Sequence, residues 1–282
     1  MKTYNTVKEL QAALKKHKGE SVGFVPTMGA LHSGHIALMK NSIKENDITV
    51  CSIFVNPTQF NVKSDLEKYP RTLKSDSEKL EKAGVDILFA PSVKEIYPKG
   101  TKKSIKVNLK GLDKQMEGQF RPGHFEGVVQ VVHRLLEIVN PTRLYMGQKD
   151  FQQFTIIAQM IKSLKMKVEL VVVKIQRAKD GLALSSRNVR LTKAKRKWAP
   201  IIYKALKKAK RSMKSKTVEE VEAIAMEELG KPRGYNPEYF TIVDGYTLKP
   251  IKDWSDSDYI VAATAVWAGK IRLIDNMILK QA

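Results

Sequence analysis

A chain of 282 residues can form one large domain or two ordinary ones, with enough volume for a sizeable core. Hydrophobic residues make up 43% of it, which is typical of a globular protein and argues against a disordered one. Fifty lysines and arginines against 29 acidic residues give a net charge of +21, and such a field attracts nucleic acid, acidic membranes or small polyanions. The single cysteine, Cys51, excludes an intrachain disulfide framework.

The sequence lacks the patterns of secretion and of membrane insertion. The first ten residues, MKTYNTVKEL, contain no apolar segment of the kind found in signal peptides. No apolar run approaches the roughly 18 residues that a membrane span requires. We therefore expect a cytoplasmic protein without a membrane partner.

Apolar runs rich in Val and Ile alternate with helical patterns through the first 174 residues. We expect strands at 21–26, 47–55, 85–91, 143–147 and 167–175. We expect helices at 35–46, 73–84, 125–140 and 150–164, with Gly84 and Asn140-Pro141 as stop signals. Continuous apolar strands that alternate with helices predict an α/β domain over residues 1–174, built on a parallel sheet with helices on both faces.

The pattern changes after about Val173. Two helical stretches, roughly 193–213 and 217–229, are followed by apolar runs at 238–244, 258–268 and 270–279. The last two runs flank Ala268-Gly269, a hairpin signal. Residues 175–282 are therefore predicted to form a smaller C-terminal α+β domain.

The stretch from Lys193 to Lys216 carries eleven Lys or Arg residues and no acidic residue. It also carries apolar residues at helical spacing: Trp198, Ile201, Ile202, Leu206, Ala209 and Met213. We interpret it as an amphipathic helix whose lysines face solvent. A nucleic-acid surface is the alternative, which the lack of aromatics between the lysines disfavours.

Two histidines in "VPTMGALHSGH" (25–35) fall between a predicted strand and a predicted helix. In an open α/β sheet, this is the edge where ligands bind, and a helix N-terminus favours anions. His32 and His35 can both donate hydrogen bonds to phosphoryl oxygens. A metal site is less favoured, because no cysteine or carboxylate at ligand spacing accompanies the pair. Two ordinary surface histidines remain the other alternative.

Three further segments carry polar groups suited to phosphate, ribose or a small acid. The segment "DGLALSSRN" (180–188) is loop-like, and its Ser185, Ser186 and Arg187 suit phosphate oxygens, as part of a closing lid or as an ordinary polar turn. In "MGQKDFQQF", Lys149 could contact phosphate and Asp150 ribose, unless Asp150 is only a helix N-cap. In "FVNPTQF", Asn56 and Gln59 suit the hydroxyl and carboxylate of a small polar acid.

"RPGHFEGVV" places His124 before another predicted helix, as a site residue or as a structural histidine that caps a loop. The chain has neither a Walker loop nor a G-x-G-x-x-G after its first predicted strand. Any use of ATP must therefore rely on a different arrangement.

The strand, His-Ser-Gly-His and helix arrangement resembles the HIGH signature of the nucleotidyl-transferase superfamily. Together with "FVNPTQF", "DLEKYPRT", "RPGHFEGV", "GQKDFQQ" and "DGLALSSRN", it resembles the pantothenate synthetase family from about Gly23 to Asn188. The C-terminal third is similar mainly through "RLIDN" (272–276), which is less specific.

The resemblance implies an ATP-dependent ligase that joins (R)-pantoate to β-alanine and forms pantothenate, AMP and pyrophosphate. The pantoate carboxylate would attack the α-phosphate of ATP to give a pantoyl adenylate, and the amine of β-alanine would then displace AMP. The family also implies a cytoplasmic homodimer with a Rossmann-like N-terminal domain, Mg²⁺ accompanying ATP, and no specific nucleic-acid partner.

The resemblance also implies roles for individual residues. His35 would be a proton donor, and His32, His35 and Lys149 would stabilise charge on phosphate. The remaining nucleotide contacts would come from Met28, Gly29, Ala30, Leu31, Ser33, Gly34, Gly147, Gln148, Asp150, Leu184, Ser185, Ser186, Arg187 and the backbone at Gln176. Gln59 and Gln153 would bind pantoate, with Gln59 also near β-alanine, and Asp76 is a weak candidate for helping to hold Mg²⁺.

Three positions depart from the family pattern. Leu184 stands where Met is frequent, Gln148 where Glu is common, and Gln176 where an apolar residue is usual. The Leu184 exchange conserves volume, and the contact implied at Gln176 is a backbone one. None of the departures affects the two histidines, Lys149 or Arg187.

The residues leave two other functions open. Another HIGH-type adenylyltransferase would leave AMP on its product, although Asn56, Gln59 and Gln153 match a pantoate pocket. A nucleic-acid-binding protein is motivated by the +21 charge and would bind RNA with a steep salt dependence.

Overall fold

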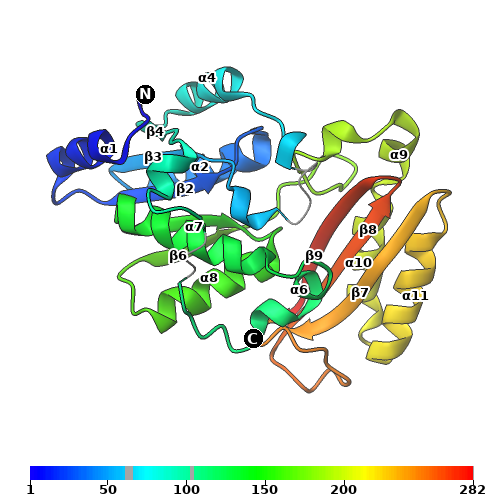
Figure 1. Ribbon diagram of the computed structural model, residues 1–282. Coiled ribbons are helices and arrows are strands. Elements are labelled where there is room, and N and C mark those ends of the chain that lie inside the picture. Colours follow the sequence, from blue (N-terminus) through cyan, green and yellow to red (C-terminus); the bar gives the residue numbers. More distant parts are fainter. Residues whose placement is uncertain (61–65, 102–104, 282) are drawn as a thin grey trace. The chain divides into compact units, whose positions relative to one another are not determined.

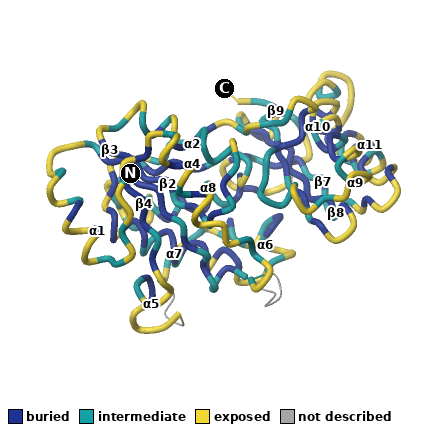
Figure 2. Tube along the Cα trace, turned by 90° about the horizontal axis from the view of Figure 1, so that it is seen from above, coloured by how far each residue is buried: buried dark blue, intermediate teal, exposed yellow. Residues whose placement is uncertain are grey.

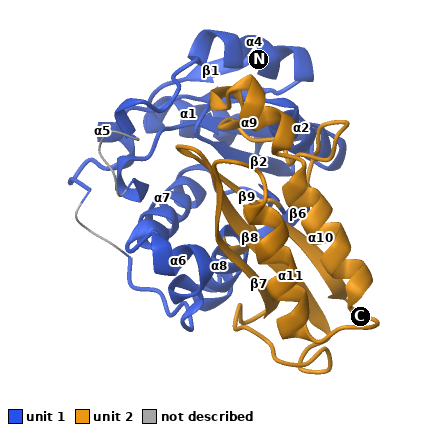
Figure 3. Cartoon of the chain, turned by 90° about the vertical axis from the view of Figure 1, so that its right-hand side faces the viewer, with its two compact units in different colours: residues 1–148, 153–174 blue, residues 149–152, 175–282 orange. Residues whose placement is uncertain are grey.

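The computed structural model describes residues 1–60, 66–101 and 105–281, and the chain divides into two compact units (Figure 3). The first unit comprises residues 1–148 and 153–174. The main segment of the second unit begins at Ile175, and the short segment Lys149–Gln152 clusters with it. Asp65, the first residue of "DLEKYPRT", lies outside the described residues.

Within the described residues, the first unit is built on a six-stranded parallel sheet (Figure 1). Its order along the sheet is β1-β4-β3-β2-β5-β6. The strands are β1 (Lys2–Tyr4), β2 (Val22–Thr27), β3 (Ile48–Ile53), β4 (Ile87–Phe89), β5 (Arg143–Gly147) and β6 (Glu169–Val173). The predicted parallel sheet is confirmed.

Helices cover both faces of this sheet. Helix α2 packs against α4 on one face, and α1 packs against α7 on the other (Figure 1). The helices are α1 (Val7–Leu14), α2 (Ser33–Glu45), α4 (Leu73–Ala83), α5 (Val93–Ile96), α6 (Met116–Phe120), α7 (His124–Val139) and α8 (Phe151–Ser163). Short 3₁₀ turns are η1 (Lys15–His17), η2 (Pro57–Gln59) and η3 (Leu112–Lys114).

The sequence explains why these strands lie in the middle of the unit. Strands β2 and β3 are almost continuously buried, as expected for parallel strands covered on both faces (Figure 2). Helix α2 lies so close to β2 that a Cβ at Gly23 would come within 2.1 Å of Ser42 Oγ. Both predicted helix stops are confirmed, because Gly84 and Asn140 adopt left-handed conformations at the C-caps of α4 and α7.

The strand order reverses between β2 and β5. From β2 the chain proceeds to β3 on one side, and from β5 it proceeds to β6 on the other. Ligands of open α/β sheets bind beyond the carboxyl ends of the strands at such a switch point. A ligand-binding site is therefore expected among the residues that follow β2 and β5.

The N-terminal β1 and α1 were not expected from the sequence. Strand β1 has only three residues, too few for a periodic pattern. Helix α1 begins with a capping box in which the Thr6 side chain accepts from Glu9 N and the Glu9 carboxylate accepts from Thr6 N.

The second unit has a three-stranded antiparallel sheet in the order β7-β8-β9. Its elements are η4 (Asn188–Arg190), α9 (Lys193–Trp198), α10 (Ile201–Ser212), α11 (Val218–Gly230), β7 (Tyr235–Asp244), β8 (Tyr259–Ala268) and β9 (Ile271–Gln281). Helices α10 and α11 share one hydrophobic core with the sheet. The predicted hairpin is confirmed, since Ala268 pairs with Ile271 across a turn in which Gly269 has φ of 64°.

The single helix predicted over 193–213 was wrong. Pro200 separates α9 from α10, because proline has no N–H to continue the helix. The amphipathic interpretation is confirmed for α10, which buries Ile202, Leu206 and two alanines and exposes its lysines. Trp198, counted among the apolar positions, is 53% exposed at the end of α9. No helix in the described part of the chain is long and apolar enough to cross a membrane.

Candidate active site

The segment that leaves β2 turns sharply before α2 begins. Gly29 has φ of 79° and Ala30 has φ of 51°, so two consecutive residues adopt the left-handed conformation. For Ala30 this conformation carries steric strain, which surrounding contacts must compensate. The compensating contacts come from α4.

Asp76 of α4 anchors this turn. Its side chain is fully buried, and its two carboxylate oxygens accept hydrogen bonds from Ala30 N at 2.8 Å and Leu31 N at 2.9 Å. Thr72 Oγ1 donates to the same carboxylate at 2.9 Å, and Lys79 Nζ lies 3.6 Å from it. The carboxylate is therefore engaged within the protein, and this geometry favours an anchoring role over the predicted role in holding Mg²⁺.

The two histidines form the N-terminal cap of α2, and each accepts a hydrogen bond from a backbone N–H there. His32 is the N-cap residue, and its Nδ1 accepts from Gly34 N at 3.1 Å. His35 Nδ1 accepts from His32 N at 3.3 Å, and the two ring centroids lie 4.0 Å apart. Because a backbone N–H can only donate, both Nδ1 atoms must be unprotonated, and each neutral ring carries its proton on Nε2.

This arrangement gives the start of α2 an anion-binding character. Ser33 and Gly34 form the first turn of the helix, whose N–H groups and dipole favour negative charge. The fixed tautomers add two imidazole N–H donors at the same helix end. The preceding Leu31 is buried, and its carbonyl accepts from Lys79 Nζ at 2.9 Å, so the helix start is held on both sides.

Gln59 lies next to this loop through Met28. Gln59 is buried in η2, and its Nε2 lies 3.0 Å from Met28 Sδ. Its side-chain carbonyl accepts from Asn56 Nδ2 at 3.2 Å, and its backbone carbonyl accepts from His124 Nδ1 at 2.8 Å. This contact favours the structural role for His124 that the sequence left as an alternative.

Asn56, predicted to contact substrate, has its side chain engaged in the protein. It is 1% exposed, and its Nδ2 also donates to Gly127 O at 3.0 Å. Its Oδ1 accepts from Tyr97 OH at 2.8 Å and Thr58 Oγ1 at 3.0 Å. Tyr97 and Thr58 were not singled out from the sequence, although Thr58 lies within "FVNPTQF".

The carboxyl end of β5 is formed by Gly147 and Gln148. Gln148 N donates to Val173 O at 2.9 Å, which extends the pairing with β6 by one residue. A Cβ at Gly147 would meet no atom within 4 Å, so the surface beside it is open. Gln153 follows in the first turn of α8, where it is half-buried.

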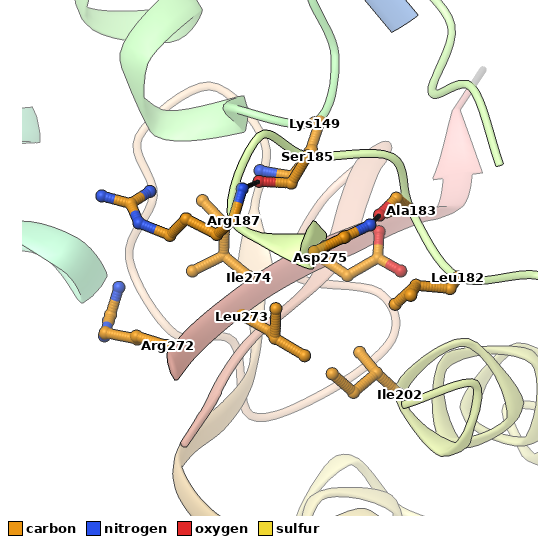
Figure 4. A pocket seen from close by; sticks show the side chains of 11 residues that line it. Lys149, Leu182, Ala183, Ser185, Arg187, Ile202, Arg272, Leu273, Ile274 and Asp275 are labelled. Atoms are coloured by element: carbon orange, nitrogen blue, oxygen red, sulfur yellow. Dashed lines mark hydrogen bonds between the residues drawn. The ribbon is translucent and has the colours of Figure 1, made fainter. Parts of the chain in front are cut away.

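Lys149 and the segment 180–188, called here the serine–arginine loop, both belong to the second unit. Together they line a pocket above β9, to which that strand contributes Arg272 and Asp275 (Figure 4). The complete lining is Lys149, Leu182, Ala183, Ser185, Arg187, Asn188, Ile202, Arg272, Leu273, Ile274 and Asp275. Asp150, which directly precedes α8, places its carboxylate 3.4 Å from Lys149 Nζ.

The serine–arginine loop is shaped by its own backbone and side chains. Ser185 Oγ accepts from Arg187 N at 3.2 Å, and Asn188 Nδ2 donates to Ala183 O at 2.9 Å. Leu184 N donates to Gln176 O at 2.9 Å. The backbone of this loop is thereby fixed, with Ser186 between the two residues that line the pocket.

The predicted site residues therefore fall into two groups. The first unit brings together residues 28–35, called here the histidine loop, and Gln59 with the residues that bond it, Asn56 and His124. The second brings together Lys149, Ser185 and Arg187 around one pocket. No group of three or more His, Cys, Asp or Glu side chains that could hold a metal occurs among the residues the structure describes.

Comparisons with known proteins find relatives over nearly the whole chain. The family model described as pantoate-beta-alanine ligase matches residues 2–278. A pantothenate synthetase of Phocaeicola vulgatus is 50% identical over 280 residues, covering 98% of this chain and 99% of that protein. A crystal structure of pantothenate synthetase from Thermus thermophilus is similar with a TM-score of 0.92 and 43% identity, covering 99% of this chain and 100% of that one.

A crystal structure of pantoate-beta-alanine ligase from Francisella tularensis is similar with a TM-score of 0.82 and 37% identity. The match covers 99% of this chain and 98% of that one. That protein is described as complexed with beta-gamma ATP and beta-alanine.

Proposed function

The chain belongs to the pantoate–β-alanine ligase family and catalyses its ATP-dependent ligation, and we propose how its residues perform the two steps. In the first, the pantoate carboxylate attacks the α-phosphorus of ATP and pyrophosphate leaves. In the second, the β-alanine amine attacks the activated carbonyl, and AMP leaves as the amide bond forms. The observation that carries the proposal is the pair of capping histidines, whose geometry presents two Nε2–H donors at a helix N-terminus.

His32 and His35 act on the α-phosphate. Negative charge accumulates on its oxygens as the carboxylate oxygen approaches, and hydrogen bonds from preorganised donors strengthen as it does. The backbone from Met28 to Gly34 lines the nucleotide, and the anchored turn at Ala30 fixes its path. The neutral His35 ring donates a hydrogen bond from its Nε2–H and keeps the proton, and the backbone N–H of His32 holds the ring in place through its Nδ1.

Lys149, Ser185, Ser186 and Arg187 hold the triphosphate. Ser185 and Arg187 line one pocket with Lys149, which supports a shared ligand rich in negative charge. Gly147 and Gln148 approach the nucleotide through their backbone, and Asp150 binds the ribose hydroxyls. Leu184 joins the residues that hold the triphosphate, and the backbone at Gln176 contacts the adenine.

Gln59 and Gln153 bind pantoate, and Gln59 also contacts β-alanine. The buried position of Gln59 beside Met28 supports this, because it places an amide next to the nucleotide loop. Asn56, whose own groups are engaged, orients the Gln59 amide through the contact at 3.2 Å. We accordingly assign ATP and pantoate binding to the domain 1–174, and the Ser-Ser-Arg lid loop to 175–282.

The described residues do not fit a protein-built Mg²⁺ cage. Asp76 uses its carboxylate to hold two backbone N–H groups and Thr72, and no cluster of three ligands is present in the described residues. Mg²⁺ commonly binds through substrate phosphates with few protein ligands, so we propose that it enters with ATP. No step of the proposed mechanism depends on it.

We further propose a cytoplasmic homodimer without a specific nucleic-acid partner. Membership in the family supports the first two properties. For the third, the lysine-rich α10 buries its apolar side against the sheet of its own unit, so its composition has a structural explanation. Sedimentation of the purified protein tests whether it is a dimer, and cell fractionation tests its location. Titration with RNA over a salt series tests whether it binds nucleic acid specifically.

One two-stage assay tests the proposed reaction. Pyrophosphate release is measured with ATP and pantoate, and AMP release is then measured on addition of β-alanine. We expect pyrophosphate release that requires pantoate, followed by AMP release that requires the amine. An adenylated product that persists in the presence of β-alanine would instead identify a simple adenylyltransferase.

A further inference from the structure

The segment Arg272–Asn276 of β9 contains two buried polar residues for which the proposed mechanism has no use. Asp275 and Asn276 are 4% and 2% exposed. Consecutive residues of a strand point to opposite faces of its sheet, so the pair can hold two different segments at once. Asn276 N donates to Asp275 Oδ1 at 2.8 Å, which ties the two residues together.

Asp275 holds the serine–arginine loop through Arg177. The Arg177 guanidinium donates to both carboxylate oxygens, at 2.6 and 3.0 Å. It also donates to Gly181 O at 3.1 Å and lies 4.1 Å from the Tyr203 ring centroid. The turn that leads into Ser185 is therefore fixed to β9.

Burial and charge make this pair rigid. Burial raises the pKa of the Asp275 carboxyl, and the Arg177 guanidinium opposes that effect by stabilising the ionised form. A bidentate arginine–carboxylate pair fixes orientation as well as distance. Without Arg177, the Asp275 carboxylate would be a buried and uncompensated charge.

Asn276 holds Lys149 from the other side. Its Nδ2 donates to Lys149 O at 2.9 Å, a contact between residues 127 positions apart in sequence. Lys149–Gln152 cluster with the second unit, although the flanking residues belong to the first. This hydrogen bond provides a physical reason for that grouping.

We propose that Arg177, Asp275 and Asn276 are positioning residues that assemble Lys149 and the Ser185–Arg187 loop into one cationic site before ATP arrives. The proposal rests on the proposed function, in which these residues hold the triphosphate. Preassembly matters because a site that is already ordered loses less conformational entropy when its ligand binds. The pocket lined by both segments and by Asp275 is the assembled site (Figure 4).

A double-mutant cycle tests the link to Lys149. Asn276→Asp preserves shape but replaces the N–H donor by an oxygen, which repels the Lys149 carbonyl. We expect kcat/KM for ATP to fall about tenfold or more, with KM for pantoate changed less than about twofold. In a Lys149→Ala background, the same substitution should change kcat/KM for ATP less than about threefold. Equal fold losses in both backgrounds would overturn the proposal.

A matched control separates positioning from stability. Ser257 is buried in the same unit, and its Oγ bonds Asp244 away from the pocket. Ser257→Ala should lower Tm while leaving both KM values unchanged. If Ser257→Ala lowered kcat/KM for ATP as much as Asn276→Asp does, the effect would be one of stability and the proposal would fail.

Calorimetric titration with a non-hydrolysable ATP analogue distinguishes this proposal from the proposed function. The same cycle measured as Kd should show weaker binding for Asn276→Asp, with the loss largely absent in the Lys149→Ala background. Wild-type binding without pantoate-dependent pyrophosphate release would reject the proposed reaction alone. An unchanged Kd in Asn276→Asp would reject the positioning role alone.

Discussion

The histidine loop of the first unit and the serine–arginine loop of the second are held by opposite chemistry. Behind the histidine loop, the Asp76 carboxylate accepts from the backbone N–H groups of Ala30 and Leu31. Behind the serine–arginine loop, the Arg177 guanidinium donates to the carbonyl of Gly181. A buried anion supports the first loop, and a partly exposed cation paired with the buried Asp275 supports the second.

The difference follows from which backbone groups each loop needs to orient. The histidine loop presents the N–H groups of Ala30 and Leu31 just before the N-cap residue of α2, and a carboxylate can accept from both. In the serine–arginine loop, the turn at Gly181 lies between the bridge partners Arg177 and Ala183, and a donor can stabilise its carbonyl. Both sets of contacts fix the backbone of the loop that they support.

The largest expected effect comes from the histidine loop. His35→Ala removes a preorganised donor, and we expect pyrophosphate release to fall about 10²- to 10³-fold. His133→Ala, at a partly exposed position of α7 beside Glu137, is the control and should retain activity. A near-normal rate for His35→Ala, with the fold verified by circular dichroism, would exclude His35 from the adenylation step.

The serine–arginine loop should respond mainly in its handling of ATP. Arg187→Ala removes a charged hydrogen-bond donor from the pocket, and kcat/KM for ATP should fall about 10- to 100-fold. Steady-state kinetics at saturating pantoate measure the effect. Arg190→Ala, an exposed change three residues later, is the control. Unchanged kcat and KM for ATP in Arg187→Ala would place the loop away from the triphosphate.

The anchor of the histidine loop should affect both stability and rate. Asp76→Asn replaces one carboxylate oxygen by an amide, which cannot accept from a backbone N–H. We expect a loss of about 1–3 kcal/mol in the free energy of unfolding, measured in urea, together with slower adenylation. Glu78→Gln, on the exposed side of the same helix, should change neither. Full stability in Asp76→Asn would show that the strained turn does not depend on its carboxylate.

The smallest effect should come from an ion pair at the edge of the serine–arginine loop. The hydrogen bond from Arg196 holds the pKa of Asp180 below its ordinary value of about 3.9. Its stabilising contribution is therefore complete above about pH 4 and is lost as pH falls through the lowered value. Because the pair is exposed, Asp180→Asn should cost at most about 0.5 kcal/mol at pH 7.

Thermal unfolding of the wild type and Asp180→Asn between pH 7 and pH 2 checks this sign. The two proteins should converge at acid pH. A gap that widened toward low pH would contradict the ion pair.

Much of the fold follows from local sequence because its signals are local. Continuous Val and Ile runs predicted the parallel strands, and Gly84 and Asn140-Pro141 predicted two helix ends. The prediction of one helix over 193–213 was wrong because apolar residues keep helical spacing across Pro200, although proline interrupts helical hydrogen bonding. The short β1 had too few residues to reveal a period.

The sequence predicted the candidate site less completely than the fold. The histidines and the serine–arginine loop could be selected because they sit at strand ends or in polar turns. Asn56 was selected for the same reason, but its side chain supports Gln59, Gly127 and Tyr97 within the protein. A side-chain amide can bind a ligand or join a buried hydrogen-bond network equally well. The sequence alone does not distinguish these two roles.

The sequence by itself determined most strands, several helix ends, and which residues have side chains of a kind suited to phosphate oxygens. These properties depend on backbone preference and on periodicity over a few residues. Only the tertiary structure decided that Asp76 anchors the Ala30 turn and that Asn276 binds the Lys149 carbonyl. Such contacts join residues that are distant in sequence, and no local pattern encodes which distant group will face a given backbone atom.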